Sequence, residues 1–237
     1  MSLKGDMLMK DKIIDEMIEK VIMYFQEDEI TKLIIKRLAE MRLKEDIVKD
    51  GNTVFFKDPK FLRAITIDKD RKILVLTERG QKRQNLEEKQ FENTIYYNIN
   101  EGNGVIVKET KDIDKKLIRG QKEETEAKVT KYKYYKENKE YSSSVEKKDK
   151  KTIMDENDTT ILEQERTNNI LNYELIYGDY IQRQEKDGKV NYYYYYKYEP
   201  ETYSKIKITE EDFKRFVAYD GDAYGILNDK LFSNLRR

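Results

Sequence analysis

The sequence of 237 residues contains no cysteine, no histidine and no tryptophan, and only 2 prolines. Without cysteine the chain forms no disulfide and offers no thiol nucleophile or thiolate ligand for a metal. Without histidine it lacks the commonest general base and the commonest ligand of transition metals. These absences weigh against zinc-dependent and histidine-dependent enzymes, and they leave carboxylate, lysine and tyrosine chemistry open.

The sequence also lacks the common motifs of enzymes and metal sites. It has no glycine-rich phosphate loop and no Gly-x-Ser-x-Gly turn. The stretch that starts at Asp155 begins like a calcium loop, but Thr160 replaces the glycine of the sharp turn and Arg166 replaces the bidentate glutamate. Asp220 and Asp222 flank a glycine where a turn explains them. We therefore expect no metal and no cofactor, and we lean towards a protein that is not an enzyme.

No run of apolar residues reaches the roughly eighteen that a membrane-spanning helix needs. The first residues, MSLKGDMLMKDK, also lack the apolar centre of a signal peptide. We expect a cytoplasmic protein, or a secreted one if the first residues replace a natural leader.

Charge is abundant but balanced, with 47 basic and 47 acidic residues making up 40% of the chain. Proteins that bind duplex DNA usually carry a basic excess, because phosphate neutralisation supplies much of their affinity. The balance therefore disfavours that class for the chain as a whole. The many Lys, Ile, Asn and Tyr residues are typical of an AT-rich genome, which offers a neutral explanation for part of the tyrosine content.

Three segments show the apolar spacing of amphipathic helices. Residues 13–25 and 30–41 predict a helical pair whose apolar stripes must be covered by the following sheet or by a second copy of the chain. Residues 209–221 predict a short terminal helix, with Thr209 as N-cap, Phe213, Phe216 and Val217 in the buried stripe and Gly221 near its end.

Short β-branched and aromatic stretches predict antiparallel strands from residue 52 onwards. Hairpins are expected at 61–77, at 94–110 and around the Asp187-Gly188 turn, while 80–91 could be a brief helix and 111–120 one or two helical turns. The charged stretch 110–151 alternates enough to predict long solvated strands. The sequence thus predicts an α+β fold with a helical pair, a mainly antiparallel sheet of hairpins or a meander, and a short C-terminal helix. Three segments are suggested, 1–110, 111–151 and 152–237, which could also form one continuous domain.

The run NYYYYYKYEP, residues 191–200, has aromatic side chains on both faces if it forms a strand, because successive side chains alternate. Either alternate set could face the core, and the other set would then be available to a partner. Tyrosine combines a flat apolar ring with a hydroxyl group, which suits protein interfaces and base stacking. With the similar segment KYKYYK, the candidate binding residues are Tyr132, Tyr134, Tyr192, Tyr193, Tyr194, Tyr195, Tyr196, Lys197 and Tyr198.

These features favour a non-catalytic module that binds another protein, of the inhibitor, immunity, anti-defence or accessory structural type. The alternative is a nucleic-acid-binding protein that uses the Tyr/Lys-rich strands or a winged-helix-like N-terminal region. For the latter, the motif LTERG, with Leu76, Thr77 and Gly80, resembles the end of the wing in winged-helix regulators, which implies a helix after the glycine. The helical pair could also support self-association.

Overall fold

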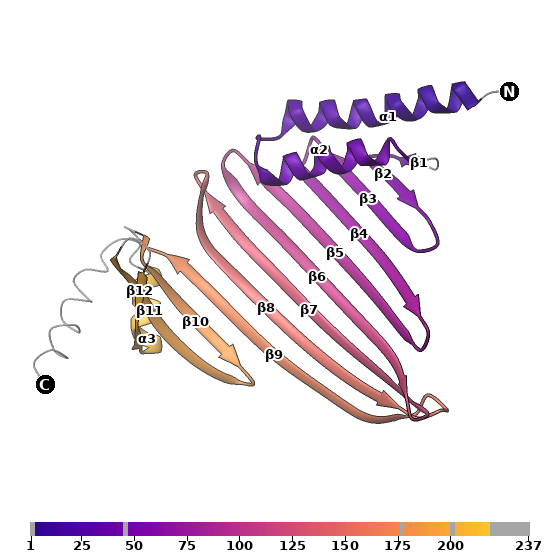
Figure 1. Cartoon of the computed structure of the whole chain (residues 1–237). Helices are drawn as coiled ribbons and strands as arrows, with labels where there is room; N and C mark the ends of the chain where they lie inside the picture. Colours follow the sequence, from indigo (N-terminus) through magenta and orange to yellow (C-terminus); the bar gives the residue numbers. More distant parts are fainter. Residues whose placement is uncertain (1–2, 45–46, 176–177, 200–201, 219–237) are drawn as a thin grey trace, which may run out of the picture.

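The computed structural model describes residues 3–44, 47–175, 178–199 and 202–218. Within these residues the chain forms three helices and one antiparallel sheet, whose twelve strands follow one another in space as they do in sequence. This meander confirms the expected α+β fold (Figure 1). The elements are α1 (Leu3–Tyr24), α2 (Glu29–Met41), β1 (Ile47–Asp50), β2 (Thr53–Lys57), β3 (Phe61–Asp68), β4 (Ile73–Gln84), β5 (Glu87–Asn100), β6 (Asn103–Ile118), β7 (Gln121–Lys136), β8 (Lys139–Met154), β9 (Thr160–Glu174), β10 (Tyr180–Lys186), β11 (Lys189–Glu199), β12 (Thr202–Ile208) and α3 (Glu210–Ala218).

Helices α1 and α2 cover one face of the first strands, which we call the α1/α2 face. The α2 helix begins at the N-cap Asp28, whose carboxylate accepts hydrogen bonds from the backbone N–H groups of Ile30 and Thr31. The sheet covers most of the two apolar stripes, which is one of the two covers expected for them. The fully buried residues of this core include Ile14, Met17, Val21, Ile34, Leu38, Met41, Val54, Ile65, Leu74 and Leu76. Ile22, which the helical spacing places in the stripe, is exposed.

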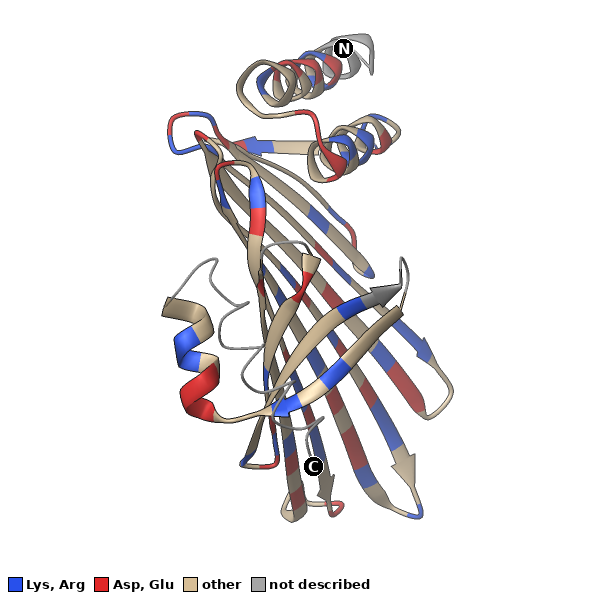
Figure 2. Cartoon of the chain, turned by 90° about the vertical axis from the view of Figure 1, so that its left-hand side faces the viewer, with Lys and Arg blue, Asp and Glu red and all other residues tan. Residues whose placement is uncertain are grey.

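The long central strands β6 to β9 meet the helices only near their ends among the described residues, where Ile106 of β6 packs against the first core and Tyr173 of β9 contacts Phe213 of α3. Their stability comes from side chains that meet across neighbouring strands, and many of these are oppositely charged. Figure 2 shows basic and acidic residues interspersed along these strands. The high charge of the chain, 40% of its residues, therefore suits a sheet whose central strands are open to water over most of their length. Ion pairs of 2.7–3.0 Å join Lys111 to Glu126, Lys115 to Glu124, Lys128 to Glu109 and Lys151 to Glu123.

The C-terminal helix α3 lies on the opposite face of the sheet, which we call the α3 face. Phe213 and Phe216 of α3 pack with Ile181, Tyr194 and Ile208 in a second core. The helix begins as predicted, since the Thr209 hydroxyl accepts a hydrogen bond from the backbone N–H of Asp212 at 3.1 Å. The prediction that Val217 is buried was wrong, because this side chain is 41% exposed. Strand register shows that the two cores lie on different faces. Directly opposed residues on neighbouring strands point to the same face of a sheet. From Tyr97 of the first core, this pairing runs across the strands through Ile106, Lys133, Ser143, Asn172, Gln182 and Tyr193. Ile181 and Tyr194 of the second core are sequence neighbours of Gln182 and Tyr193, so they point to the other face, the α3 face.

Two helical predictions were wrong. Residues 80–91 form the β4–β5 hairpin with a turn at Asn85-Leu86, and residues 111–120 belong to β6 and the turn that follows it. Both stretches are rich in Lys, Glu and Gln, which favour helices locally, but cross-strand pairing outweighs that preference. Gly80 lies within β4, where the ring of Phe91 occupies the space that a Cβ atom would need. The chain continues as a strand after Gly80, so the resemblance to a winged-helix wing does not extend to the structure.

The strand and hairpin predictions at 61–77, 94–110 and 186–189 are confirmed by the β3–β4, β5–β6 and β10–β11 pairs. The stretch 110–151 forms strand for most of its length, also as predicted. The division of the chain into three segments stays a prediction, although strands from all three belong to one sheet.

Gly221, Asp220 and Asp222 lie outside the described residues. No described helix is both long and apolar enough to cross a membrane.

Candidate binding face on the last three strands

The tyrosine run forms most of β11 and is divided between the two faces of the sheet. Tyr192, Tyr194 and Tyr196 point to the α3 face, where all three contact the second core. Tyr194 is only 1% exposed, its ring stacks on Phe216 at 5.4 Å, and its hydroxyl donates a hydrogen bond to Asp179. This alternate set of tyrosines is therefore structural.

Tyr193 and Tyr195 point to the α1/α2 face, far along the sheet from α1 and α2. There they meet two tyrosines from the neighbouring strands. Tyr195 stacks on Tyr180 of β10, with ring centroids 4.5 Å apart and planes at 9°. Tyr203 of β12 packs edge-on against Tyr180 at 5.4 Å, and Tyr193 lies 6.4 Å from Tyr195. The four rings form one cluster that no described helix covers.

Lysines surround this cluster on the same face. Lys205 lies over the ring of Tyr193, with its Nζ atom 4.9 Å from the centroid, which is a cation–π contact. By strand register the α1/α2 face of β10 to β12 carries no acidic residue among those whose side chains are described. We call this surface the tyrosine–lysine face. It consists of Tyr180, Tyr193, Tyr195, Tyr203, Lys186, Lys189, Lys197, Lys205 and Lys207.

The lysines of this face differ from many of the lysines on the central strands β6 to β8. Lys111, Lys115, Lys128 and Lys151 are each paired with a glutamate. The five lysines of the tyrosine–lysine face are exposed, and none forms an ion pair with a described residue. A protein that is neutral overall therefore presents a locally positive surface.

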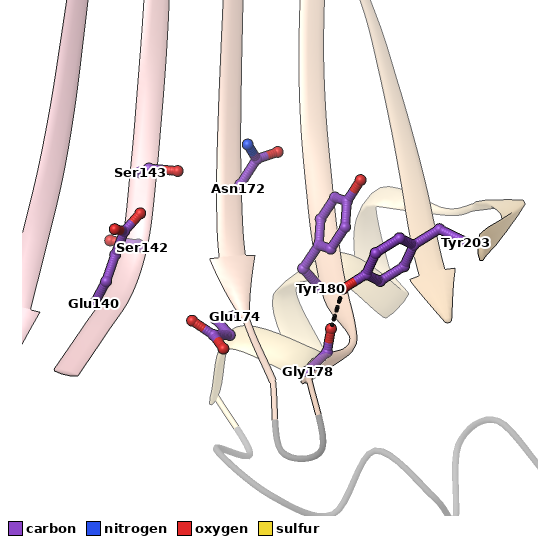
Figure 3. Close-up of a pocket in the computed structure, with 8 residues that line it drawn as sticks. All are labelled: Glu140, Ser142, Ser143, Asn172, Glu174, Gly178, Tyr180 and Tyr203. Atoms are coloured by element: carbon purple, nitrogen blue, oxygen red, sulfur yellow. Dashed lines mark hydrogen bonds between the residues drawn. The ribbon is translucent and has the colours of Figure 1, made fainter. Parts of the chain in front are cut away.

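A shallow hollow of about 300 Å³ adjoins the tyrosine cluster (Figure 3). Tyr180 and Tyr203 stand on one side of it and residues of β8 on the other, with β9 between them. The Tyr203 hydroxyl donates a hydrogen bond to the carbonyl oxygen of Gly178 at 3.1 Å, which fixes the ring at the rim. Polar groups dominate the remaining lining, which consists of Glu140, Ser142, Ser143, Asn172 and Glu174.

Burial raises the pKa of Tyr180 above its usual value, and the negative charge that ionised Tyr195 and Tyr203 would carry raises it further. The Tyr180 hydroxyl therefore stays protonated at neutral pH. It remains able to donate a hydrogen bond to a partner.

The structure does not bring the other predicted tyrosines to this face. Tyr132 and Tyr134 lie on the α3 face of β7, where their rings stack at 6.3 Å and Tyr134 also contacts Tyr141. They are half-buried and belong to a different surface from Tyr193 and Tyr195. Lys197 lies on the tyrosine–lysine face, and the side chain of Tyr198 lies outside the description.

Sequence reasoning missed Tyr180 and Tyr203. A signal for Tyr180 was present, because a two-residue turn at Asp187-Gly188 fixes the register of the strands on either side. Counting outwards from the Lys186–Lys189 pair places Tyr180 opposite Tyr195, as the structure shows. Tyr203 follows a connection for which the sequence offers no comparable turn signal.

No group of three or more carboxylates within the described part of the chain is placed to hold a metal ion. The stretch that begins like a calcium loop is the β8–β9 connection, where Asp155 accepts hydrogen bonds from the N–H groups of Asn157 and Thr159. Its carboxylate therefore stabilises a turn.

Comparisons with protein-family models, with curated proteins and with solved structures find no match. The functional argument therefore depends on the geometry of the chain itself.

Proposed function

We propose that the protein is a non-catalytic binding module whose partner is another protein, and that the tyrosine–lysine face is the binding surface. The observation that carries the proposal is that the tyrosines of β11 are divided between the two faces of the sheet. Tyr194 is buried in the second core, while Tyr193 and Tyr195 belong to the ring cluster that no described helix covers. A strand needs only one set of large rings for its core. The second set supports an interaction with a partner.

The chemistry of the cluster suits a protein interface. Tyrosine supplies a large contact area with few rotatable bonds, and it is enriched among the residues that dominate binding energy. Tyr180, Tyr195 and Tyr203 already hold one another in place, which lowers the conformational entropy lost on binding. An inhibitor, an immunity or anti-defence factor and an accessory structural protein all need only such a surface.

A second candidate is single-stranded nucleic acid, which is favoured by five unpaired lysines beside four aromatic rings. The arrangement of the rings supports a protein more strongly. Tyr180 and Tyr195 cover one face of each other, and Lys205 covers a face of Tyr193. These ring faces are therefore not open for bases to stack upon, while hydroxyl groups and ring edges remain available for protein contacts.

The proposal is tested by affinity capture from an extract of the source organism, followed by mass spectrometry. The wild-type chain and the double variant Tyr193→Ala/Tyr195→Ala are compared after nuclease treatment, at about 50 mM and about 500 mM salt. We expect a protein that the wild type retains at both salt concentrations and the variant loses. A captured nucleic acid that is released at high salt would replace the protein proposal with the second candidate. Equal capture by both chains would exclude the tyrosine–lysine face. A cytoplasmic location is part of the proposal and is checked by cell fractionation.

A further inference from the structure

We propose that the partner binds by adding a strand to the free edge of β12, and that this strand alternates acidic and apolar residues. The inference rests on the proposed function, since it names the chemistry of the protein that the tyrosine–lysine face binds. Three observations support it: β12 is a free edge of the sheet, one face of β12 carries lysines, and its other face carries apolar residues.

The β12 strand is one of the two edges of the sheet. It pairs with β11 through residues 202–208, and no described residue pairs with its other side. A strand in this position presents backbone N–H and C=O groups to any extended chain that approaches. The opposite edge, β1, is only four residues long, and its Lys49 is tied to Glu16 of α1 by an ion pair of 2.6 Å. The longer edge is therefore the more suitable one for an added strand.

The two faces of β12 differ in chemistry. Tyr203, Lys205 and Lys207 point to the α1/α2 face, and Ser204, Ile206 and Ile208 point to the α3 face. Side chains of an added strand lie beside those of its neighbour on the same face. Acidic residues at alternate positions would thus meet the lysines, and apolar residues between them would extend the core formed by Ile208, Phe213 and Phe216.

Lysines on an edge strand can also serve only to prevent aggregation. That role predicts that β12 rejects added strands whatever the order of their residues. The proposal predicts that the order decides the outcome, because only strict alternation places all the acidic groups on one face. The two roles can therefore be separated by two peptides of the same composition.

The experiment uses the full chain and two acetylated, amidated heptapeptides that each contain four glutamates and three valines. One peptide alternates the two residues, and the other has the four glutamates before the three valines. We expect the alternating peptide to bind about tenfold more tightly by calorimetry, a difference within the range of a few cross-strand contacts. Equal affinities, or no binding of either peptide, would overturn the proposal.

Hydrogen exchange locates the bound peptide. We expect the amides of β12 that point away from β11 to exchange rapidly in the free protein and to be protected by the alternating peptide. Protection of these outward-pointing amides in the free protein would show that the edge is already covered and would overturn the proposal. So would a peptide that binds without protecting β12.

Two matched pairs of substitutions test the charge. Lys205→Gln/Lys207→Gln removes the positive side chains of β12, and Lys108→Gln/Lys147→Gln removes two exposed lysines of the same face on β6 and β8. We expect the first pair to weaken binding of the alternating peptide by about tenfold and the second by less than about twofold. An equal loss of affinity in the two double variants would mean that the peptide responds to the total positive charge of this face and not to the lysines of β12, which contradicts strand addition.

The outcomes also separate this inference from the proposed function. If the alternating peptide does not bind but Tyr193→Ala/Tyr195→Ala still loses the captured protein, the binding face stands and strand addition is wrong. If the peptide binds at β12 and the captured protein is unaffected by the tyrosine substitutions, the edge recognises an acidic strand but the proposed function is wrong. A thymidine oligonucleotide that displaces the peptide and protects the same amides would point to nucleic acid and would overturn the acidic strand.

Discussion

Tyr194 and Tyr195 are neighbours in the sequence and belong to opposite faces of one strand. Tyr194 is buried against Phe216 beneath α3, whereas Tyr195 stacks on Tyr180 on the uncovered face. One short run of identical residues thus contributes both to the core and to the surface that we propose as the binding site.

Stability should respond differently to the two residues. We expect Tyr194→Ala to lower the free energy of unfolding by about 3–5 kcal/mol, as large truncations in a core do. Tyr195→Ala should lower it by about 1 kcal/mol, because its ring is only half-buried and loses mainly the stacking on Tyr180. Urea denaturation of both variants measures the difference. Equal losses would show that the α1/α2 face of β11 is core as well.

A buried arginine should matter for the first core. Arg63 is 9% exposed and lies between Glu78, at 2.7 Å, and Glu40, at 2.9 Å. Arg63→Ala leaves the largely shielded Glu78 with only its longer contact to Arg37, at 3.3 Å, and should destabilise the protein by about 3 kcal/mol. The matched control is Arg79→Ala on the next strand, whose exposed pair with Glu92 should be worth less than about 1 kcal/mol. Similar losses from both variants would contradict the importance of burial for this arginine.

The stability of the helical layer should depend on acid pH. Hydrogen bonds from Lys20 and then from Lys49 lower the pKa of Glu16 to about 2 in the folded chain. The unfolded value of a glutamate is about 4.3, so the contribution of Glu16 is fully present above that pH and is lost as the pH falls towards 2. Glu16→Gln should therefore be less stable than wild type at about pH 6, and the two should converge near about pH 2.

Denaturant midpoints across this pH range provide the measurement. The control is Glu19→Gln, since Glu19 is exposed on the same helix and forms no ion pair with a described residue. A constant difference between Glu16→Gln and wild type at every pH would contradict the assignment.

The charged ladder of the central strands should stabilise the sheet through many small terms. Lys111 and Glu126 lie 2.9 Å apart on β6 and β7 and are both partly shielded from solvent. A double-mutant cycle with Lys111→Ala and Glu126→Ala should give a coupling energy of about 0.2–1 kcal/mol that decreases at high salt. A coupling energy near zero would mean that the central strands are held together by backbone hydrogen bonds and by the aliphatic parts of their side chains alone.

Much of the fold could be predicted from local signals. The helical pair, the terminal helix and three hairpins have periodic apolar residues, good caps or turn residues that act within a few positions. The β4–β5 hairpin was missed because its Lys, Glu and Gln residues favour helices, and only contacts with the partner strand reveal their role. The side on which α3 packs was equally hidden, since Tyr192 to Tyr196 offer the same side chain to both faces of the sheet.

The candidate site was predictable only in part, because some of its residues have a local sequence signal and others are brought together by strand pairing. The run at 192–196 was recognised, but Tyr180 and Tyr203 reach the cluster through strand pairing, and Tyr132 and Tyr134 are separated from it by the thickness of the sheet. Charge was misleading too. A neutral total conceals the difference between β6 to β8, where many lysines are paired with glutamates, and the tyrosine–lysine face, where no lysine forms an ion pair with a described residue.

The most direct measurement of the binding proposal is the dissociation constant of the captured protein for three chains: wild type, Tyr193→Ala/Tyr195→Ala, and the control Tyr132→Ala/Tyr134→Ala. The control removes two half-buried rings from the opposite face and so matches the loss of aromatic surface. We expect the first double variant to weaken binding by 1–2 kcal/mol or more, roughly tenfold or beyond, because tyrosines at the centre of an interface dominate its energy. The control should stay within about twofold of wild type. A partner that binds the Tyr193/Tyr195 variant as tightly as wild type, with both variants folded, would contradict the account.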